Sequence, residues 1–162
     1  QEDCERNSQP EQKEENRMSQ VDSAQLFYLL LSNEPSVANE ITDGLGAHLY
    51  GPPGLPVEFT LRKAIMYIDD GGPGNINLPI GQHEFEVYCY GKTSAEARQV
   101  YLALYNFLHR KKHIRIALGG GTYAIFQYGQ KLSGPQDRVE PAEGWPYVFC
   151  SFYVHFIELT TT

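Results

Sequence analysis

The sequence has few of the residues that usually stabilise a small domain by covalent or metal cross-links. It contains only three cysteines, Cys4, Cys89 and Cys150, which lie far apart and form no CxxC pair. This spacing excludes the common zinc sites and a disulfide framework. Cys89 and Cys150 fall in strand-like segments, so we expect both to be buried as small apolar side chains. Cys4 lies in a polar segment, and its pairing between chains stays open.

Long apolar runs and an excess of positive charge are also missing. No run of about 18 apolar residues occurs, so we predict no membrane span and no membrane partner. The formal net charge is −7, which argues against a protein that holds nucleic acid through its phosphates. The basic cluster at residues 109–113 (HRKKH) is interpreted as a helix end, where cations interact favourably with the helix dipole.

What is present is typical of one folded domain. The chain has 162 residues, of which 41% are hydrophobic and 20% charged, as in ordinary globular proteins. Aromatic residues make up 12%, with 11 Tyr and 8 Phe. Tyrosine suits surfaces that become buried against a partner. It equally suits an ordinary tyrosine-rich sheet, and the composition leaves both interpretations open.

The first residues differ in character from the rest. Residues 1–17 contain six acidic and three basic residues and no large apolar side chain. Such a segment cannot bury enough apolar surface to fold alone. We therefore divide the chain into an acidic, flexible N-terminal arm, residues 1–17, and a folded domain, residues 18–162. We expect the arm to stay solvated or to order against a neighbouring subunit.

Two helices are predicted from their caps and apolar spacing. Asp22, with Gln25 three residues later, forms a capping-box pattern before apolar residues 24–31, and Asn33 and Pro35 end that helix. A short helical turn follows through residues 37–41. The second helix is predicted for residues 93–109. It begins with the capping box Thr93 and Glu96 and carries an apolar stripe of Ala97, Val100, Tyr101, Leu104, Phe107 and Leu108.

Six strands and three loops complete the pattern. The predicted strands are residues 47–50, 63–69, 82–90, 114–118, 123–128 and 146–159. The last is apolar on both faces, which indicates a central position in the sheet. The predicted loops are residues 51–56, 70–75 and 129–145, of which the last is long enough to project as a flap. This order indicates a single α+β domain, with a mostly antiparallel sheet and helices packed on one face.

Phosphate and metal sites are not supported by the motifs. The glycine-rich stretches at 71–74 and 119–121 lack the following Lys-Ser/Thr or Rossmann spacing, so we interpret them as turns. Asp69 and Asp70 lack the ligand spacing of a calcium loop and are interpreted as a turn cap. His109 and His113 flank three cations, which disfavour a metal ion there. We predict no cofactor and no metal.

Catalytic residues are not assigned either. Cys89 or Cys150 would need a histidine such as His83 or His155 beside it, and nothing in the sequence places one there. Alternation in residues 82–90 puts Phe85, Val87 and Cys89 on one face. Glu84, Glu86, Tyr88 and Tyr90 take the other face, which we expect to be solvated or part of an interface. The sequence therefore predicts a protein that is not an enzyme.

Two segments carry a family resemblance. They are residues 62–74 (RKAIMYIDDGGPG) with 78–80 (LPI), and residues 85–98 (FEVYCYGKTSAEAR) running on to Leu108 and His109. A strand ending in CYG, a capped T-x-x-E-A helix and a final Leu-His resemble the tail terminator, or tail completion, proteins of long-tailed bacteriophages. Residues 146–148 are similar to the C-terminal strand of that family. The resemblance covers about residues 18–159.

This resemblance implies a structural virion protein that is assembled in the host cytoplasm and resides at the head-proximal end of the tail. Family members form a ring, usually of six subunits, which caps the tail tube and joins it to the head connector. The implied partners are copies of this chain, the tail tube protein and the connector or neck protein. Genomic DNA would pass through the ring without specific binding. Loops 51–56, 70–81 and 129–145 are expected to reach neighbours.

Three alternatives stay open at this point. One is another neck or completion protein, or a tail tube subunit, of the same kind of virion. A second is a small enzyme or ligand-binding α+β domain, which requires a pocket with converging polar groups. The third is a nucleic-acid-binding module that stacks bases on its aromatic residues.

Overall fold

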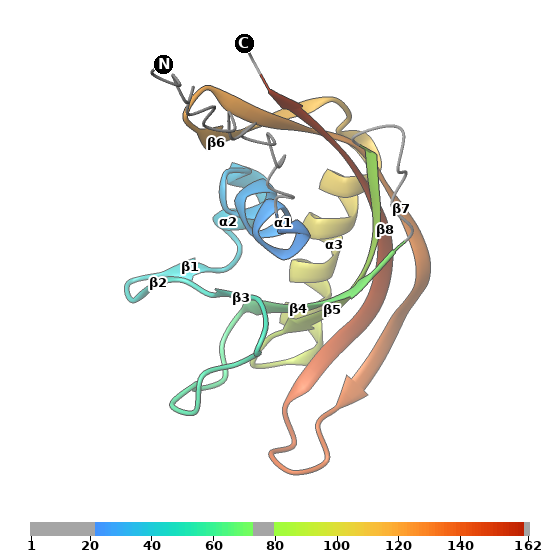
Figure 1. Cartoon of the computed structure of the whole chain (residues 1–162). Coiled ribbons are helices and arrows are strands. Elements are labelled where there is room, and N and C mark those ends of the chain that lie inside the picture. The colour runs from blue at the N-terminus through green and yellow to red at the C-terminus, as the bar shows by residue number, and fades with distance from the viewer. Residues whose placement is uncertain (1–21, 73–79, 161–162) are drawn as a thin grey trace, which may run out of the picture.

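A computed structural model describes residues 22–72 and 80–160, which form a single α+β domain. A long, curved sheet wraps around the helices (Figure 1). The predictions for the arm at residues 1–17, for Cys4, for a domain start at residue 18 and for the part of the predicted loop 70–81 that falls on residues 73–79 lie outside the described residues. Within the described ranges, no helix is both long and apolar enough to cross a membrane.

The two capped helices, α1 and α3, begin where the caps predict, whereas the short turn expected at residues 37–41 begins earlier, at Pro35. Helix α1 spans Ser23–Ser32, and the Asp22 carboxylate accepts a hydrogen bond from the Ala24 backbone N at 3.0 Å. Helix α2 is a single turn, Pro35–Ala38. Helix α3 spans Ser94–Arg110, with the Thr93 hydroxyl accepting from the Glu96 backbone N at 3.2 Å. The buried side of α3 is the predicted apolar stripe.

The main sheet has six strands in the order β3-β4-β5-β8-β7-β6. These are β3 (Leu49–Tyr50), β4 (Ala64–Gly71), β5 (Ile80–Tyr90), β6 (Ile114–Gly119), β7 (Thr122–Val139) and β8 (Pro146–Thr160). Only β3 and β4 run parallel; the other neighbours are antiparallel. Strand β8 pairs with both β5 and β7, so the predicted central position is confirmed. A separate hairpin is formed by β1 (Thr42–Asp43) and β2 (Gly46–Ala47).

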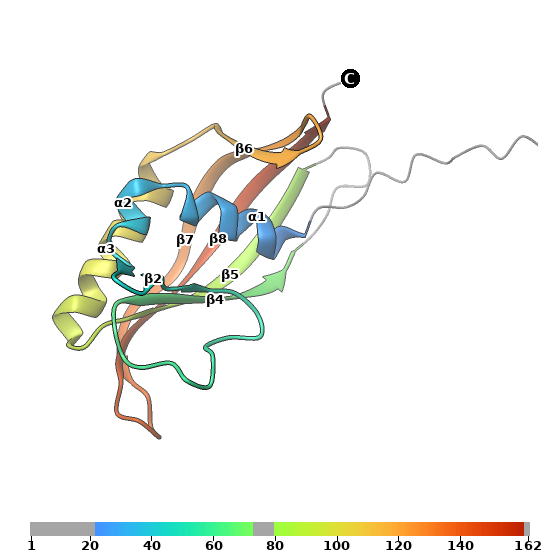
Figure 2. The ribbon, with the colours of Figure 1, turned by 90° about the vertical axis from the view of Figure 1, so that its left-hand side faces the viewer.

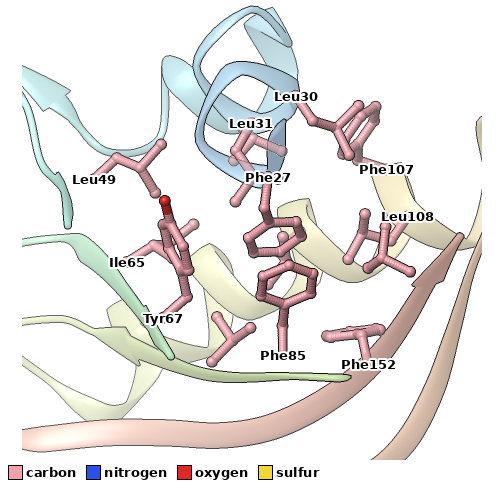
Figure 3. Packing of buried hydrophobic residues seen from close by; sticks show 14 of the residues in the cluster. Phe27, Leu30, Leu31, Leu49, Ile65, Tyr67, Phe85, Phe107, Leu108 and Phe152 are labelled. Carbon is pink, nitrogen blue, oxygen red and sulfur yellow. The ribbon is translucent and has the colours of Figure 1, made fainter. Parts of the chain in front are cut away.

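The helices cover the concave face of the sheet, as Figures 1 and 2 show from two sides. In Figure 3, Phe27 of α1 lies against Phe85 of β5, with stacked rings 4.2 Å apart between centroids. Tyr67 of β4 meets Phe27 edge-on and donates its hydroxyl hydrogen to the Ala24 carbonyl at 2.7 Å. Phe152 of β8 completes this contact layer. The predicted arrangement, with helices on one face, is confirmed.

A glycine makes the junction between β5 and α3 possible. Gly91 is buried between the end of β5 and the first turn of α3. A Cβ atom at this position would lie 2.4 Å from the Ala97 backbone N, closer than any side-chain carbon is found. The motif CYG-K-T-x-x-E-A is therefore a packing motif, in which glycine allows strand and helix to approach.

The prediction of a flap at residues 129–145 is wrong. Strand β7 continues to Val139, and its pairing with β8 runs from Thr122 opposite Thr160 to Val139 opposite Pro146. Polar residues join this ladder because backbone pairing needs no apolar side chain when the partner strand is held in the core. Register shifts absorb the irregular residues, including the Gly134–Pro135 step. Only residues 140–145 form the connection between the two strands.

Three smaller predictions also need correction. Residues 47–50 are not one strand, because His48 separates β2 from β3 and these strands pair with different partners. Asp70 and Gly71 belong to β4 and do not start a loop. Tyr90 is buried, because Phe59 and Trp145 pack near it in a second, smaller core on the other side of the sheet.

Candidate functional site

A polar cleft of about 440 Å³ lies where the β1–β2 hairpin, the segment before β4 and the start of α3 meet. It is lined by Glu40, Ile41, Thr42, Asp43, His48, Thr60, Leu61, Arg62, Lys63, Lys92 and Glu96. No motif in the sequence marks this site, because its polar residues come from three separate segments.

His48 is the buried polar residue among those that line this cleft. Its Nε2 lies 2.8 Å from Asp43 Oδ1, and its Nδ1 lies 3.1 Å from the Tyr50 hydroxyl oxygen. A neutral ring with its hydrogen on Nε2 satisfies both contacts, donating to Asp43 and accepting from Tyr50. The hydrogen bond from His48, followed by one from the Leu45 backbone N–H, lowers the pKa of Asp43 below its ordinary value.

Two further ion pairs lie in the cleft. Arg62 lies 3.2 Å from Asp43, and the Lys63 ammonium lies 3.1 Å from Glu40. The two lining hydroxyls are also engaged: Thr42 donates to the Ala38 carbonyl, and Thr60 accepts from Arg62. Neither hydroxyl hydrogen-bonds to His48. We conclude that these polar groups hold the β1–β2 hairpin against the domain.

The candidate metal ligands of the sequence are placed apart or engaged in local contacts. Asp69 accepts hydrogen bonds from Ser23 and from the Gly71 backbone N, as a turn cap does. His83 Nδ1 lies 3.6 Å from the same carboxylate, too far for a hydrogen bond. His109 stacks on Tyr105. Among residues 22–72 and 80–160, no group of three or more His, Cys, Asp or Glu is arranged to hold a metal ion.

Neither of the two cysteines in the described part of the chain has a histidine beside it. Cys89 and Cys150 are fully buried on the concave face, as predicted. Burial raises the pKa of the Cys89 thiol well above its ordinary value. His155 alternates to the opposite face of β8, where it stacks on Tyr128. His83 shares a face with Cys89 but lies six positions along β5, roughly 20 Å away at the usual rise per residue.

The opposite side of the sheet carries a row of half-exposed aromatic rings. We call the side chains of Glu84, Glu86, Tyr88, Tyr147, Phe149 and Tyr153 the convex face. Tyr88 packs against Phe149 and Tyr147 at 5.3 and 5.7 Å between ring centroids. Burial, and then the Glu86 carboxylate that accepts its hydrogen bond, raises the pKa of Tyr88 to about 12. No helix of the described residues covers this row, in contrast to the concave face.

Three apolar side chains are exposed on segments that project from the domain (Figure 1). Leu45 is at the tip of the β1–β2 hairpin and is 79% exposed, and Val57 in the β3–β4 connection is fully exposed. Val139, at the end of β7, is 60% exposed. Single exposed apolar residues are common on protein surfaces. Their placement on three projecting segments makes these candidate contact points for other subunits.

The comparisons with known proteins give a likeness of fold. No family model and no curated protein matches the sequence. A chain of the solved structure described as the virion of a native gene transfer agent (GTA) particle superposes with a TM-score of 0.53 and 14% sequence identity. The match covers 82% of this chain and 91% of that chain. The domain described above is therefore similar in fold to a chain of that virion particle.

Proposed function

We propose that this chain is a structural subunit of a phage-like virion and acts as a tail terminator. The observation that carries the proposal is the likeness of fold to a chain of a gene transfer agent virion, which extends over most of both chains. The motifs at residues 62–74 and 85–98, which resemble those of tail terminators, support the same assignment. In this proposal the protein has no catalytic role.

Ring formation explains the projecting apolar side chains. A ring of identical subunits requires a contact between two different patches of the same subunit, at a rotation that closes. Leu45 is at the tip of the β1–β2 hairpin, whereas Val57 and Val139 lie near the β3–β4 and β7–β8 connections, which contact one another through Phe59 and Trp145. The exposed side chains therefore belong to two different parts of the domain. We assign these tips to the contact between copies. The hydrogen bonds around His48 support this role, because they hold the Leu45 hairpin in position.

The convex face is assigned to a second virion protein. Its aromatic rings are half-exposed and already packed against one another, which lowers the entropy lost when a partner covers them. In a tail terminator the partners are the tail tube protein and the head connector. The protein would reside at the head-proximal end of the tail after assembly in the host cytoplasm, and DNA would pass through the ring.

Native mass spectrometry and negative-stain microscopy of the full chain test this function. We expect a closed particle of about six times the 18.3 kDa chain mass, alone or after addition of tail tubes. Tubes that grow without limit would identify a tube subunit instead. A chain that stays monomeric and does not cap tail tubes would contradict the proposal.

A pair of variants tests the assigned contacts. Leu45→Asp and Val57→Asp should abolish the ring, because each places a charge in an apolar contact. Leu102→Asp is the matched control, since Leu102 is 50% exposed on α3 and not on a projecting segment. Equal effects of the three variants would argue against contacts through the tips.

A further inference from the structure

Charge is distributed unevenly along this acidic chain. Residues 97–136 contain six Lys or Arg residues and no Asp or Glu, although the whole chain has 20 acidic residues and a net charge of −7. Four of the six cations, Arg110, Lys111, Lys112 and Arg115, lie around the connection from α3 to β6. We call residues 109–115 the basic turn.

The helix dipole accounts for only part of this cluster. Helix α3 ends at Arg110, and Lys111 is its C-cap residue. Interaction with the dipole falls off within the last turn of a helix, so Lys112 and Arg115 lie beyond its useful range. Residues 109–113 and Arg115 are all exposed. The interpretation of residues 109–113 as a helix end is confirmed, but the helix dipole does not explain the cations beyond Lys111.

The backbone of the basic turn is fixed in shape. The Lys111 N–H donates to the Phe107 carbonyl at 2.9 Å, and the His113 N–H donates to the Gln127 carbonyl of β7 at 3.3 Å. His113 adopts a left-handed conformation with φ of 57°, which is uncommon for a residue other than glycine. The cations are therefore displayed from a turn that is anchored on both α3 and the sheet.

No carboxylate of the described residues forms an ion pair with the basic turn. The ion pairs of lysine and arginine in these ranges are Arg62 with Asp43, Lys63 with Glu40, and Arg98 with Asp137. Arg115 instead lies over the Tyr123 ring, 3.9 Å from its centroid. Glu34 lines a small cleft with Arg115 but accepts a hydrogen bond from Ser36 at 2.7 Å. Neighbouring like charges repel, so a negatively charged ligand would be bound favourably here.

We propose that the acidic segment at residues 1–17 binds the basic turn. This segment has six acidic and three basic residues, so its charge is opposite to that of the turn. It is connected through residues 18–21 to Asp22, the N-cap of α1. Leu29 and Asn33, near the other end of α1, line the same small cleft as Arg115. The separation to be bridged is about 15 Å for a helix of this length.

The segment is long enough to bridge that separation. Seventeen residues can extend up to roughly 55 Å, which permits binding within one chain or to a neighbouring copy. Nucleic acid is the rival ligand for a cluster of cations, and the net charge of −7 disfavours it. This inference does not depend on ring formation, so it can fail or hold independently of the proposed function.

Zero-length carbodiimide cross-linking of the full chain, followed by peptide mass spectrometry, tests the proposal. The reagent joins a carboxylate to an amine in direct contact, with loss of one water molecule. We expect Lys111 or Lys112 to be joined to acidic residues of segment 1–17. The ion pair of Lys63 with Glu40 is an internal positive control. In 1 M salt, where charges are screened beyond about 3 Å, the arm cross-links should fall several-fold.

Matched variants and mixed labelling complete the experiment. Replacing Arg110, Lys111 and Lys112 by glutamine should release the arm, and proteolysis within residues 1–17 should then become faster. The control variant Lys111→Arg with Lys112→Arg keeps the charge and should be cleaved as slowly as the parent chain. A mixture of ¹⁵N-labelled and unlabelled chains shows whether the joined residues come from one chain or two, and either result supports docking.

Two outcomes would overturn the proposal. One is recovery of the Lys63–Glu40 product with no product between the basic turn and residues 1–17. The other is that the parent chain binds duplex DNA in a salt-sensitive manner, that the glutamine variant does not, and that proteolysis of the arm is the same in both. In that case nucleic acid would be the ligand of the basic turn.

Discussion

The two faces of the main sheet use the same strands in different ways. On the concave face, Phe85, Cys150 and Phe152 are at most 1% exposed beneath the helices. On the convex face, Tyr88 and Phe149 of the same two strands are only half-buried and contact one another.

The contrast separates folding from assembly. The concave face already holds its apolar partners within the chain, so its residues determine whether the domain folds. The convex face has no helix over it in the described part of the chain. Tyr88 and Tyr147 pack against the smaller core at one end of this face, whereas Phe149 lies outside that core and can be changed with less effect on folding. Variants with a matched substitution on each face can test this contrast, by comparing their effects on folding and on assembly.

The largest effect is expected from Phe85→Ala. Phe85 is fully buried and stacks on Phe27, and removing such a ring costs about 3–5 kcal/mol through lost burial and the cavity left behind. Urea denaturation followed by circular dichroism would measure the change in free energy of unfolding. A loss of less than 1 kcal/mol would mean that the concave face does not control folding.

Alkaline pH should give a smaller loss of stability. The pKa of Tyr101, on α3 against the concave face, and the pKa of Tyr88, on the convex face, are both raised to about 12, mainly by burial. A pKa above the ordinary value of 10.0 means that the protonated tyrosine stabilises the fold. That contribution is complete below pH 10 and is lost as the pH rises towards 12.

The same titration can distinguish the two faces. Glu86 raises the pKa of Tyr88 and has no effect on that of Tyr101. Glu86→Gln should therefore lower the pKa of Tyr88 alone, as followed by NMR of ¹³C-labelled tyrosine rings. Equal changes at both tyrosines would show that the faces are not electrically independent.

Loss of the α3 cap should cost about 1 kcal/mol. Thr93→Ala removes the hydroxyl that accepts the Glu96 N–H, and such caps contribute roughly this amount. Ser94→Ala is the neighbouring control, because Ser94 is exposed and makes no capping bond in the structure. Thermal unfolding of both variants would measure the difference, and equal melting temperatures would contradict the cap.

The smallest effect on folding is expected from Phe149→Ala on the convex face. Phe149 is half-exposed, so we expect roughly 1 kcal/mol or less in free energy of unfolding. If this face binds another virion protein, capping of tail tubes should weaken far more than folding. A variant that folds poorly, or that caps tubes as well as the parent chain, would break the contrast between the faces.

Local features of the fold were predictable from the sequence, whereas contacts between distant segments were not. The caps at Asp22 and Thr93 and the alternation of β5 depend on residues within a few positions of each other. The extension of β7 depends on pairing with β8, and the burial of Tyr90 depends on Phe59 and Trp145, which lie far apart in the chain.

The polar cleft could not be predicted for the same reason, because it is formed by residues from distant segments. Asp43 and His48 are separated by a hairpin turn, and Arg62 arrives from the other side of a long connection. No motif relates these residues, so only the fold brings them together. The role of the protein in a tail ring and the identity of its partners are predictions.

The position of β8 in the sheet has a consequence for how the chain folds during synthesis. Because this strand lies between β5 and β7, the β4–β5 pair and the β6–β7 pair share no ladder until residues 146–160 are in place. A nascent chain on the ribosome would therefore hold two unjoined half-sheets until nearly all of these residues had been synthesised and released. Release of residues 146–160 is thus a checkpoint for folding, and a chain shortened before residue 146 would lack the strand that joins the two halves of the sheet.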